Sequence, residues 1–134
     1  MAQMLNLKAQ PLTRAIEAIV AAGGSTASEA AQVASSLVEA NLKGHDSHGI
    51  GMIPRYVDAR LEGGLTVNQH PVVKMDGGAM LAVDGGQGYG QVIGREAMDL
   101  AIERAGRHGC CLMALGNSHH LGRKRHQQQE RTHN

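Results

Sequence analysis

The chain of 134 residues contains no Phe, no Trp and only 2 Tyr. Aromatic rings bury large areas, so a core built without them must be filled by Ala, Val, Leu, Ile and the 7 Met. The length suits one domain, and a hydrophobic content of 42% is sufficient for a core of moderate size. The composition therefore predicts a single small domain of modest stability.

Disulfides, basic patches and long apolar runs are also missing. Cys110 and Cys111 are the only cysteines, and neighbours on a strand point to opposite faces, so they form no disulfide framework. Residues 1–122 are weakly acidic and carry no basic stripe, which disfavours nucleic-acid binding. No apolar stretch approaches the roughly 20 residues that span a bilayer, and no signal-peptide pattern is present. We therefore expect a cytoplasmic protein that binds neither nucleic acid nor membranes.

Three segments in the first half show apolar residues at helical spacing and end at glycine: residues 11–22, 27–43 and 53–62. The second segment begins with Thr26 and Glu29, which have the spacing of a capping box. Pro54 is tolerated in the third only because that helix begins close to it. The first half is therefore predicted to be helical.

The sequence of the second half predicts strands and one further helix. Short apolar runs at 72–75 and 79–83 flank Asp76-Gly77-Gly78, which is typical of a hairpin turn. A further helix extends to His108-Gly109, and an apolar run at 110–115 has the length of a strand. The fold class is therefore mixed α/β, and we expect the partners of the last strand to lie in a portion that this chain does not contain.

A glycine-rich loop at 84–90 precedes the last predicted helix. The loop does not meet the G-x-G-x-x-G pattern, and the element before it resembles a hairpin strand, so a dinucleotide fingerprint is not predicted. Residues 123–134 contain no hydrophobic residue and three consecutive Gln. This segment is therefore predicted to be a disordered polar tail, and residues 1–122 form the domain.

Two histidine clusters stand at predicted element boundaries, His45-Asp46-Ser47-His48 and His119-His120. Imidazole has a pKa near 6.5, so it exchanges protons near neutrality, and positioned proton transfer contributes about 100- to 10,000-fold in rate. The first cluster precedes the third predicted helix, whose free N–H groups favour an anionic substrate. Such groups suit the interconversion of alcohols and carbonyls, in which a cofactor supplies the hydride.

A metal site is an alternative for the same residues. His45, Asp46, His48, His119 and His120 carry suitable ligand atoms. No Cys and no His-x-x-x-His pair completes a recognisable site, so no metal is predicted.

Four runs, in order along the chain, carry a resemblance to a known family: residues 41–50, 54–57, 84–91 and 117–122. Together they resemble the type 2 malate/L-lactate dehydrogenase family, which includes ureidoglycolate dehydrogenases and diketogulonate reductases, and within it the hydroxycarboxylate dehydrogenase B branch. The resemblance implies a non-Rossmann fold, usually homodimeric, and NAD- or NADP-dependent oxidation of small 2-hydroxy acids to 2-oxo acids. It also implies catalytic proton transfer by His48 and His120, with Ser47 and Tyr56 holding substrate oxygens.

Two departures from the family pattern matter. Many relatives have Arg where this chain has Met52, and we suggest Arg55 for the substrate carboxylate instead. Relatives are longer, and the region that binds most of the cofactor follows the Asn-Ser-x-His element, so the cofactor-binding residues stay unassigned. We therefore expect an inactive N-terminal fragment with a frameshifted or truncated tail. The alternative is a non-catalytic module that associates with itself or with a full-length relative.

Overall fold

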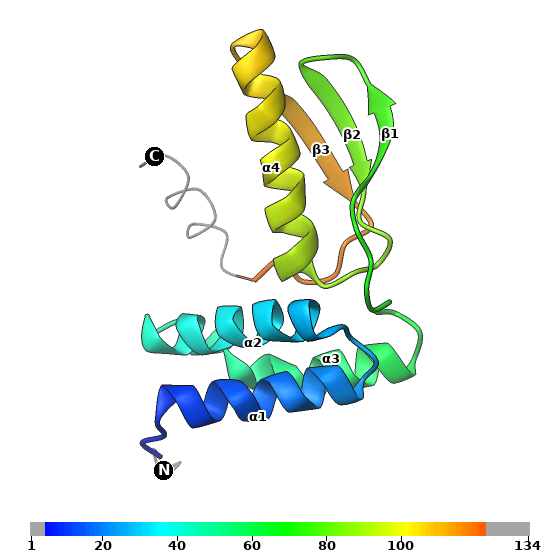
Figure 1. Ribbon diagram of the computed structural model, residues 1–134. Coiled ribbons are helices and arrows are strands. Elements are labelled where there is room, and N and C mark those ends of the chain that lie inside the picture. Colours follow the sequence, from blue (N-terminus) through cyan, green and yellow to red (C-terminus); the bar gives the residue numbers. More distant parts are fainter. Residues whose placement is uncertain (1–4, 123–134) are drawn as a thin grey trace.

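Three helices form one layer of the molecule, and a fourth helix with a three-stranded sheet stands on that layer (Figure 1). The computed structural model describes residues 5–122; the predicted tail lies outside them. The elements are, in chain order, α1 (Ala9–Ala22), α2 (Ala27–Leu42), the 3-10 turns η1 (Asp46–His48) and η2 (Ile50–Met52), α3 (Ile53–Leu61), β1 (Val72–Asp76), β2 (Met80–Asp84), α4 (Gly90–His108) and β3 (Leu112–Gly116).

The predicted mixed α/β class and the three N-terminal helices are confirmed. Apolar side chains repeat every three or four residues along these helices, so each presents one face to a common interior. Pro54 lies in the first turn of α3, where a missing N–H costs no helical hydrogen bond. The buried core comprises Ile16, Val20, Ala30, Val33, Ala34, Leu37, Ile53, Tyr56, Leu65, Tyr89 and Val92.

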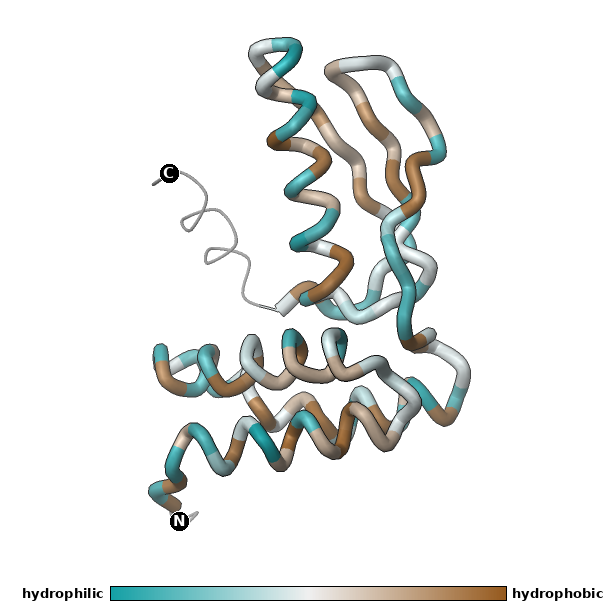
Figure 2. Tube along the Cα trace, in the orientation of Figure 1, coloured by the Kyte–Doolittle hydropathy of each residue, from teal (hydrophilic) through white to brown (hydrophobic). Residues whose placement is uncertain are grey.

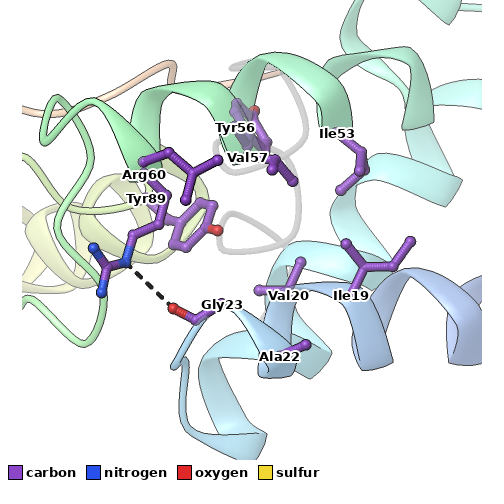
Figure 3. A pocket seen from close by; sticks show the side chains of 10 residues that line it. Ile19, Val20, Ala22, Gly23, Ile53, Tyr56, Val57, Arg60 and Tyr89 are labelled. Atoms are coloured by element: carbon purple, nitrogen blue, oxygen red, sulfur yellow. Dashed lines mark hydrogen bonds between the residues drawn. The ribbon is translucent and has the colours of Figure 1, made fainter.

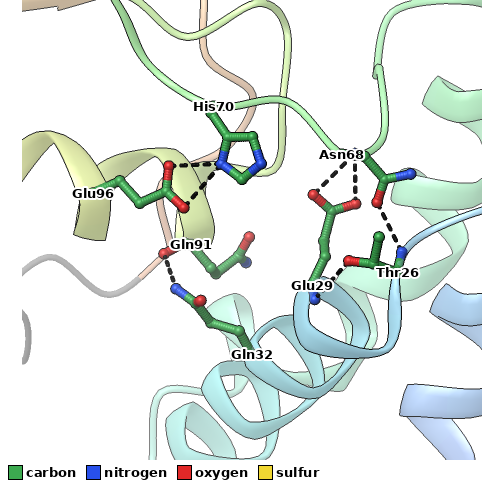
Figure 4. Close-up of polar contacts among 7 residues, drawn as sticks. All are labelled: Thr26, Glu29, Gln32, Asn68, His70, Gln91 and Glu96. Carbon is green, nitrogen blue, oxygen red and sulfur yellow. Dashed lines mark hydrogen bonds and ion pairs between the residues drawn. The ribbon is translucent and has the colours of Figure 1, made fainter.

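Only half of the predicted capping box forms at the start of α2. The Thr26 hydroxyl accepts a hydrogen bond from the Glu29 N–H, as predicted. The Glu29 carboxylate does not return to Thr26; it accepts bonds from the Asn68 N–H, at 2.9 and 3.0 Å, and from the Ser25 hydroxyl. The Asn68 side-chain oxygen accepts the Thr26 N–H instead, so a distant loop completes the cap (Figure 4).

The sheet corrects one prediction about the last strand. β1 and β2 form the predicted antiparallel hairpin, and β3 pairs with β2 in parallel, from Met80 opposite Leu112 to Asp84 opposite Gly116. The expectation that this strand lacks partners within the chain was therefore wrong. β2 is also the first strand of a β-α-β crossover through α4, which a hairpin reading of the sequence did not reveal.

The two faces of the sheet differ in burial. Side chains alternate across a strand, and α4 covers the face that carries Leu81 and Val83, which are 2% and 4% exposed. The opposite face carries large apolar residues that stay exposed: Val72, Met75, Met80 and Leu112. Apolar stretches are visible in each strand (Figure 2). Among residues 5–122, no helix is long and apolar enough to cross a membrane.

Candidate functional site

Asn41, in the last turn of α2, holds the first histidine cluster in place. Its side-chain oxygen accepts the Ile50 N–H at 2.8 Å, and its amide nitrogen donates to the Asp46 carboxylate at 2.7 Å. Gly49 is buried directly against this amide, and a Cβ there would overlap it. The glycine after His48 is therefore needed for packing, and the loop is pinned at both ends.

The segment before α3 is not an open helix terminus. The N–H of Ile50 bonds to Asn41, and the N–H of Met52 bonds to the Gly49 carbonyl, because η2 runs directly into α3. These donors are already used within the protein. The predicted attraction of an anion to free N–H groups therefore has no support from these two groups.

The second histidine cluster is laid across the start of α4. The Asn117 side chain donates to Asp84 at 3.0 Å, and the His119 N–H donates to the Gly88 carbonyl at 3.0 Å. Gly90 touches the backbone of His120 so closely that any Cβ would overlap it. The glycines of the loop before α4 thus let the histidine segment approach the helix.

The two clusters meet around Tyr56. The rings of His48 and His120 have centroids 5.2 Å apart. The Tyr56 hydroxyl lies 3.0 Å from Nδ1 of His120 and accepts a 2.7 Å hydrogen bond from the Gln91 side-chain amide. Ser47 Oγ lies 2.9 Å from Nδ1 of His48. The fold therefore joins residues from η1, α3, α4 and the segment after β3.

The electrostatic environment favours neutral imidazoles in the second cluster. Burial is the main cause that lowers the pKa of His120, and the charges of His48, His119 and Arg55 lower it further. Burial and Arg55 likewise lower the pKa of His119. The pKa of Tyr56 is raised by burial, although its bond to Gln91 and the charge of Arg55 oppose this. Near neutral pH, this cluster therefore presents uncharged hydrogen-bonding groups.

The predicted site residues Ser47, His48, Tyr56 and His120 are brought together, and Arg55 is exposed beside them on the first turns of α3. Their roles stay predictions. His45 is exposed, and His70 lies elsewhere, paired with Glu96 (Figure 4).

Three residues of this region were not assigned roles from the sequence: Asn41, Gln91 and His119. His119 packs edge-on against Tyr56, with ring centroids 5.5 Å apart. Gln91 is 3% exposed in an otherwise apolar part of α4. A buried side-chain amide needs hydrogen-bond partners, so the burial of Gln91 indicates a specific hydrogen-bonding task, and this burial is seen only in the structure.

Within residues 5–122, no group of three or more His, Cys, Asp or Glu side chains is arranged to hold a metal ion. The loop before α4 does not fit the pyrophosphate of a dinucleotide either. Its consecutive N–H groups at 85–88 donate to the chain's own oxygens: Gly116 O, Asp84 Oδ1, Asn117 O and Gly85 O. A phosphate site of this kind needs free N–H groups. This loop is therefore a structural turn.

An apolar pocket of about 370 Å³ lies between α1 and α3 (Figure 3). Tyr56 and Tyr89 contribute to its lining, and Arg60 donates a hydrogen bond to the Gly23 carbonyl at its edge. Neither His48 nor His120 lines it. The pocket is therefore separate from the histidine site, although both use Tyr56.

Known proteins are similar to this chain in sequence and in fold. Residues 7–132 match the family model of malate/L-lactate dehydrogenase. Hydroxycarboxylate dehydrogenase B of Escherichia coli (strain K12) is 49% identical over 115 residues, which cover 86% of this chain and 32% of that protein. Sulfolactate dehydrogenase from Methanocaldococcus jannaschii has a structure that matches with a TM-score of 0.87 at 31% identity, covering 94% of this chain and 37% of that one. The structure of malate dehydrogenase from Pyrococcus horikoshii OT3 matches with a TM-score of 0.81 at 33% identity, covering 88% of this chain and 34% of that one. The chain spans about a third of the length of these relatives.

Proposed function

The chain belongs to the malate/L-lactate dehydrogenase family, and from this premise we propose that it serves the oxidation of a small 2-hydroxy acid to a 2-oxo acid and the reverse reduction. The observation that carries the proposal is the meeting of His48 and His120 beside the Tyr56 hydroxyl. NAD or NADP would supply or accept the hydride. The loop before α4 does not fit that group, so its binding residues stay unassigned.

The histidines suit the proton part of this reaction. Reduction of a carbonyl needs a proton at oxygen, and oxidation of the alcohol needs a base at the same oxygen. His120 is held in one orientation by Tyr56, and His48 faces it with Nδ1 on Ser47. We propose that these two imidazoles exchange the proton, while Ser47 and Tyr56 orient the substrate oxygens.

Arg55 is the proposed partner of the substrate carboxylate. It is exposed, and its charge reaches the site, because it lowers the pKa of both His119 and His120. Met52 packs instead against the helical core. A guanidinium fork matches a carboxylate in two hydrogen bonds, so Arg55 can bind the acid end of the substrate.

A second candidate is a non-catalytic module that associates with itself or with a longer relative. The exposed apolar face of the sheet, with Leu112 71% exposed, favours it. In that case the histidine arrangement is inherited from the family, and the chain by itself does not turn over substrate.

The test is the absorbance of NADH at 340 nm with pyruvate, oxaloacetate and phenylpyruvate, for this chain and for a longer form extended to the length of its relatives. We expect turnover by the longer form, reduced about 100- to 10,000-fold by His48→Asn or by His120→Asn. His45→Asn is the matched control, since His45 is an exposed neighbour in the same loop. Turnover that survives both site substitutions would refute the proposed roles.

Assembly and location are also proposed from the family. We propose a homodimer for the full-length form and a cytoplasmic location. Light scattering of the longer form after size-exclusion chromatography measures its mass. A monomeric mass at micromolar concentration would contradict the dimer.

A further inference from the structure

The side-chain amide of Gln91 ends a hydrogen-bonded row that passes through Tyr56 to His120. Gln91 Nε2 donates to the Tyr56 oxygen at 2.7 Å, and that hydroxyl lies 3.0 Å from Nδ1 of His120. Gln91 and Tyr56 are only 3% and 1% exposed. Solvent therefore has little access to these two groups, and the hydrogen positions follow from the protein's own donors and acceptors.

The direction of each bond in this row follows from the inventory of hydrogens. The amide nitrogen of Gln91 only donates, so the Tyr56 oxygen accepts from it. The single hydrogen of the buried Tyr56 hydroxyl has one acceptor within reach among residues 5–122, Nδ1 of His120 at 3.0 Å. If the hydroxyl instead accepted from Nδ1–H, its own hydrogen would be left without an acceptor, so the favoured arrangement has Nδ1 accepting with a lone pair. A neutral imidazole with a lone pair on Nδ1 carries its hydrogen on Nε2.

We propose that Gln91 is a positioning residue that turns the Tyr56 hydroxyl toward His120 and so keeps neutral His120 in the form protonated at Nε2. The neutral state is the relevant one, because burial and the neighbouring His48, His119 and Arg55 lower the pKa of His120. Gln91 itself need not touch any substrate.

This tautomer has a consequence for the direction of the reaction, and this step rests on the proposed function. An Nε2–H group donates a hydrogen bond to the carbonyl oxygen of a 2-oxo acid, whereas a hydroxy acid needs a base with a lone pair on that nitrogen. The resting site is therefore set to bind the oxo acid. Transfer of a proton to that oxygen as hydride arrives requires the imidazolium form, so the ring takes up a second proton from solvent before this step.

The side-chain oxygen of Gln91 can stabilise the other tautomer of His120, which carries its hydrogen on Nδ1. Gln91 Oε1 is buried and has no hydrogen-bond partner among residues 5–122. Rotation of the amide would present this oxygen to Tyr56, whose hydroxyl would then donate to Gln91 and accept from Nδ1–H of His120. Nε2 would gain its lone pair. The same three residues can thus hold either tautomer, and the amide orientation selects between them.

The experiment reads the tautomer directly, without substrate or cofactor. Two-bond proton–nitrogen NMR spectra of the ¹⁵N-labelled chain, recorded above the pKa of His120, show which ring nitrogen bears the hydrogen; the signal is assigned by its loss in His120→Asn. We expect Nε2–H in the unsubstituted chain. In Gln91→Glu the carboxylate only accepts, so it draws the Tyr56 hydrogen and Nδ1 of His120 becomes protonated.

Gln32→Glu is the matched control. Gln32 donates to the backbone carbonyl of Gln91 (Figure 4), so this variant adds the same charge nearby without entering the row through Tyr56. We expect the His120 signals to keep the Nε2–H pattern.

Three outcomes would overturn the proposal: Nδ1–H in the unsubstituted chain, no change in Gln91→Glu, or the same change in Gln32→Glu. The first is decisive even where a variant does not fold. An absence of 2-oxo acid turnover would count against the proposed function alone, since the spectra need no turnover.

Discussion

The helical layer and the sheet bury their apolar surfaces to very different degrees. Inside the helical layer, Val33 and Leu37 are 0% exposed, because α1 and α3 close over α2. On the open face of the sheet, Met80 and Leu112 are 52% and 71% exposed. α4 covers one face of the sheet, and no element between residues 5 and 122 covers the other (Figure 1).

The histidine site lies against the helical layer, where apolar side chains are buried. Tyr56 belongs to the helical core, and Gln91 lies in the first turn of α4, where α4 meets α2 through the bond from Gln32. The packing that holds His120 therefore does not involve the open face of the sheet. We expect changes on that face to leave the site geometry intact.

The largest effect should come from shortening a helical-layer leucine. Leu37→Ala removes a fully buried side chain and leaves a cavity, so it should lower the free energy of unfolding by about 2–5 kcal/mol in urea titrations. Leu112→Ala is the same chemical change on the open face and should cost no more than about 0.5 kcal/mol. Equal losses in the two variants would mean that the sheet face is covered in solution.

Glu29→Ala should have the next largest effect, because it cuts the tie between α2 and the connection that leads to the sheet. Glu29 is 5% exposed and accepts the Asn68 N–H and the Ser25 hydroxyl. Unpairing them should cost about 1–3 kcal/mol in the same titrations.

Glu39→Ala is the control on the same helix, since Glu39 forms a partly exposed ion pair with Lys43. Such pairs contribute about 0–1 kcal/mol. A cost for Glu29→Ala no greater than for Glu39→Ala would show that the Asn68 contact contributes nothing.

The Glu29 contact also shows where sequence reasoning ends. The Thr26 cap was predictable, because capping uses residues three apart, but the Asn68 partner lies 42 residues from Thr26. The helices were predictable for the same local reason. The parallel pairing of β3 with β2 was missed, because a parallel partner is selected by tertiary packing and leaves no turn signal between the strands.

The candidate site was likewise predictable only in part. His48, Tyr56 and His120 were chosen because their motifs resemble a family, and the structure brings them together. Gln91 received no role, because its value depends on a contact with Tyr56, 35 residues earlier in the chain. No spacing rule relates a residue of α3 to one of α4.

A third prediction separates the two regions by pH. The pKa values of His119 and His120 are lowered from 6.5 in the folded chain. The unfolded chain therefore binds more protons, and stability should fall as the pH drops below about 6.5. Thermal unfolding between pH 8 and pH 5 measures this. The double variant His119→Asn, His120→Asn should have a flatter profile, and an unchanged slope would contradict the lowered pKa values.

The sheet region should respond in a more acidic window. Arg104, from α4, holds the pKa of Asp76 at about 2, below its ordinary 3.8. A carboxyl with a lowered pKa stabilises the fold above pH 3.8, and this contribution is lost as the pH falls from there toward 2. Arg104→Gln should reduce the loss of stability in this window and leave the near-neutral profile unchanged. If Arg104→Gln also changed the dependence of stability on pH near neutrality, the Arg104–Asp76 pair would be coupled to His119 and His120, and the two regions would not titrate separately.

The smallest effect on stability should come from the open face itself. Met80 and Leu112 are paired neighbours across β2 and β3, and both are more than half exposed. Replacing both with Thr keeps a residue that favours strands and removes apolar surface that is not buried, so each change should alter the free energy of unfolding by no more than about 0.5 kcal/mol. Solubility in ammonium sulfate should rise, because an exposed apolar strand promotes association.

Leu81→Thr changes the next residue of β2, which is 2% exposed and faces α4, and should destabilise the chain clearly more. If Met80→Thr and Leu81→Thr were equally harmful, the alternation between a covered and an open face would be wrong, and with it the contrast between the two regions.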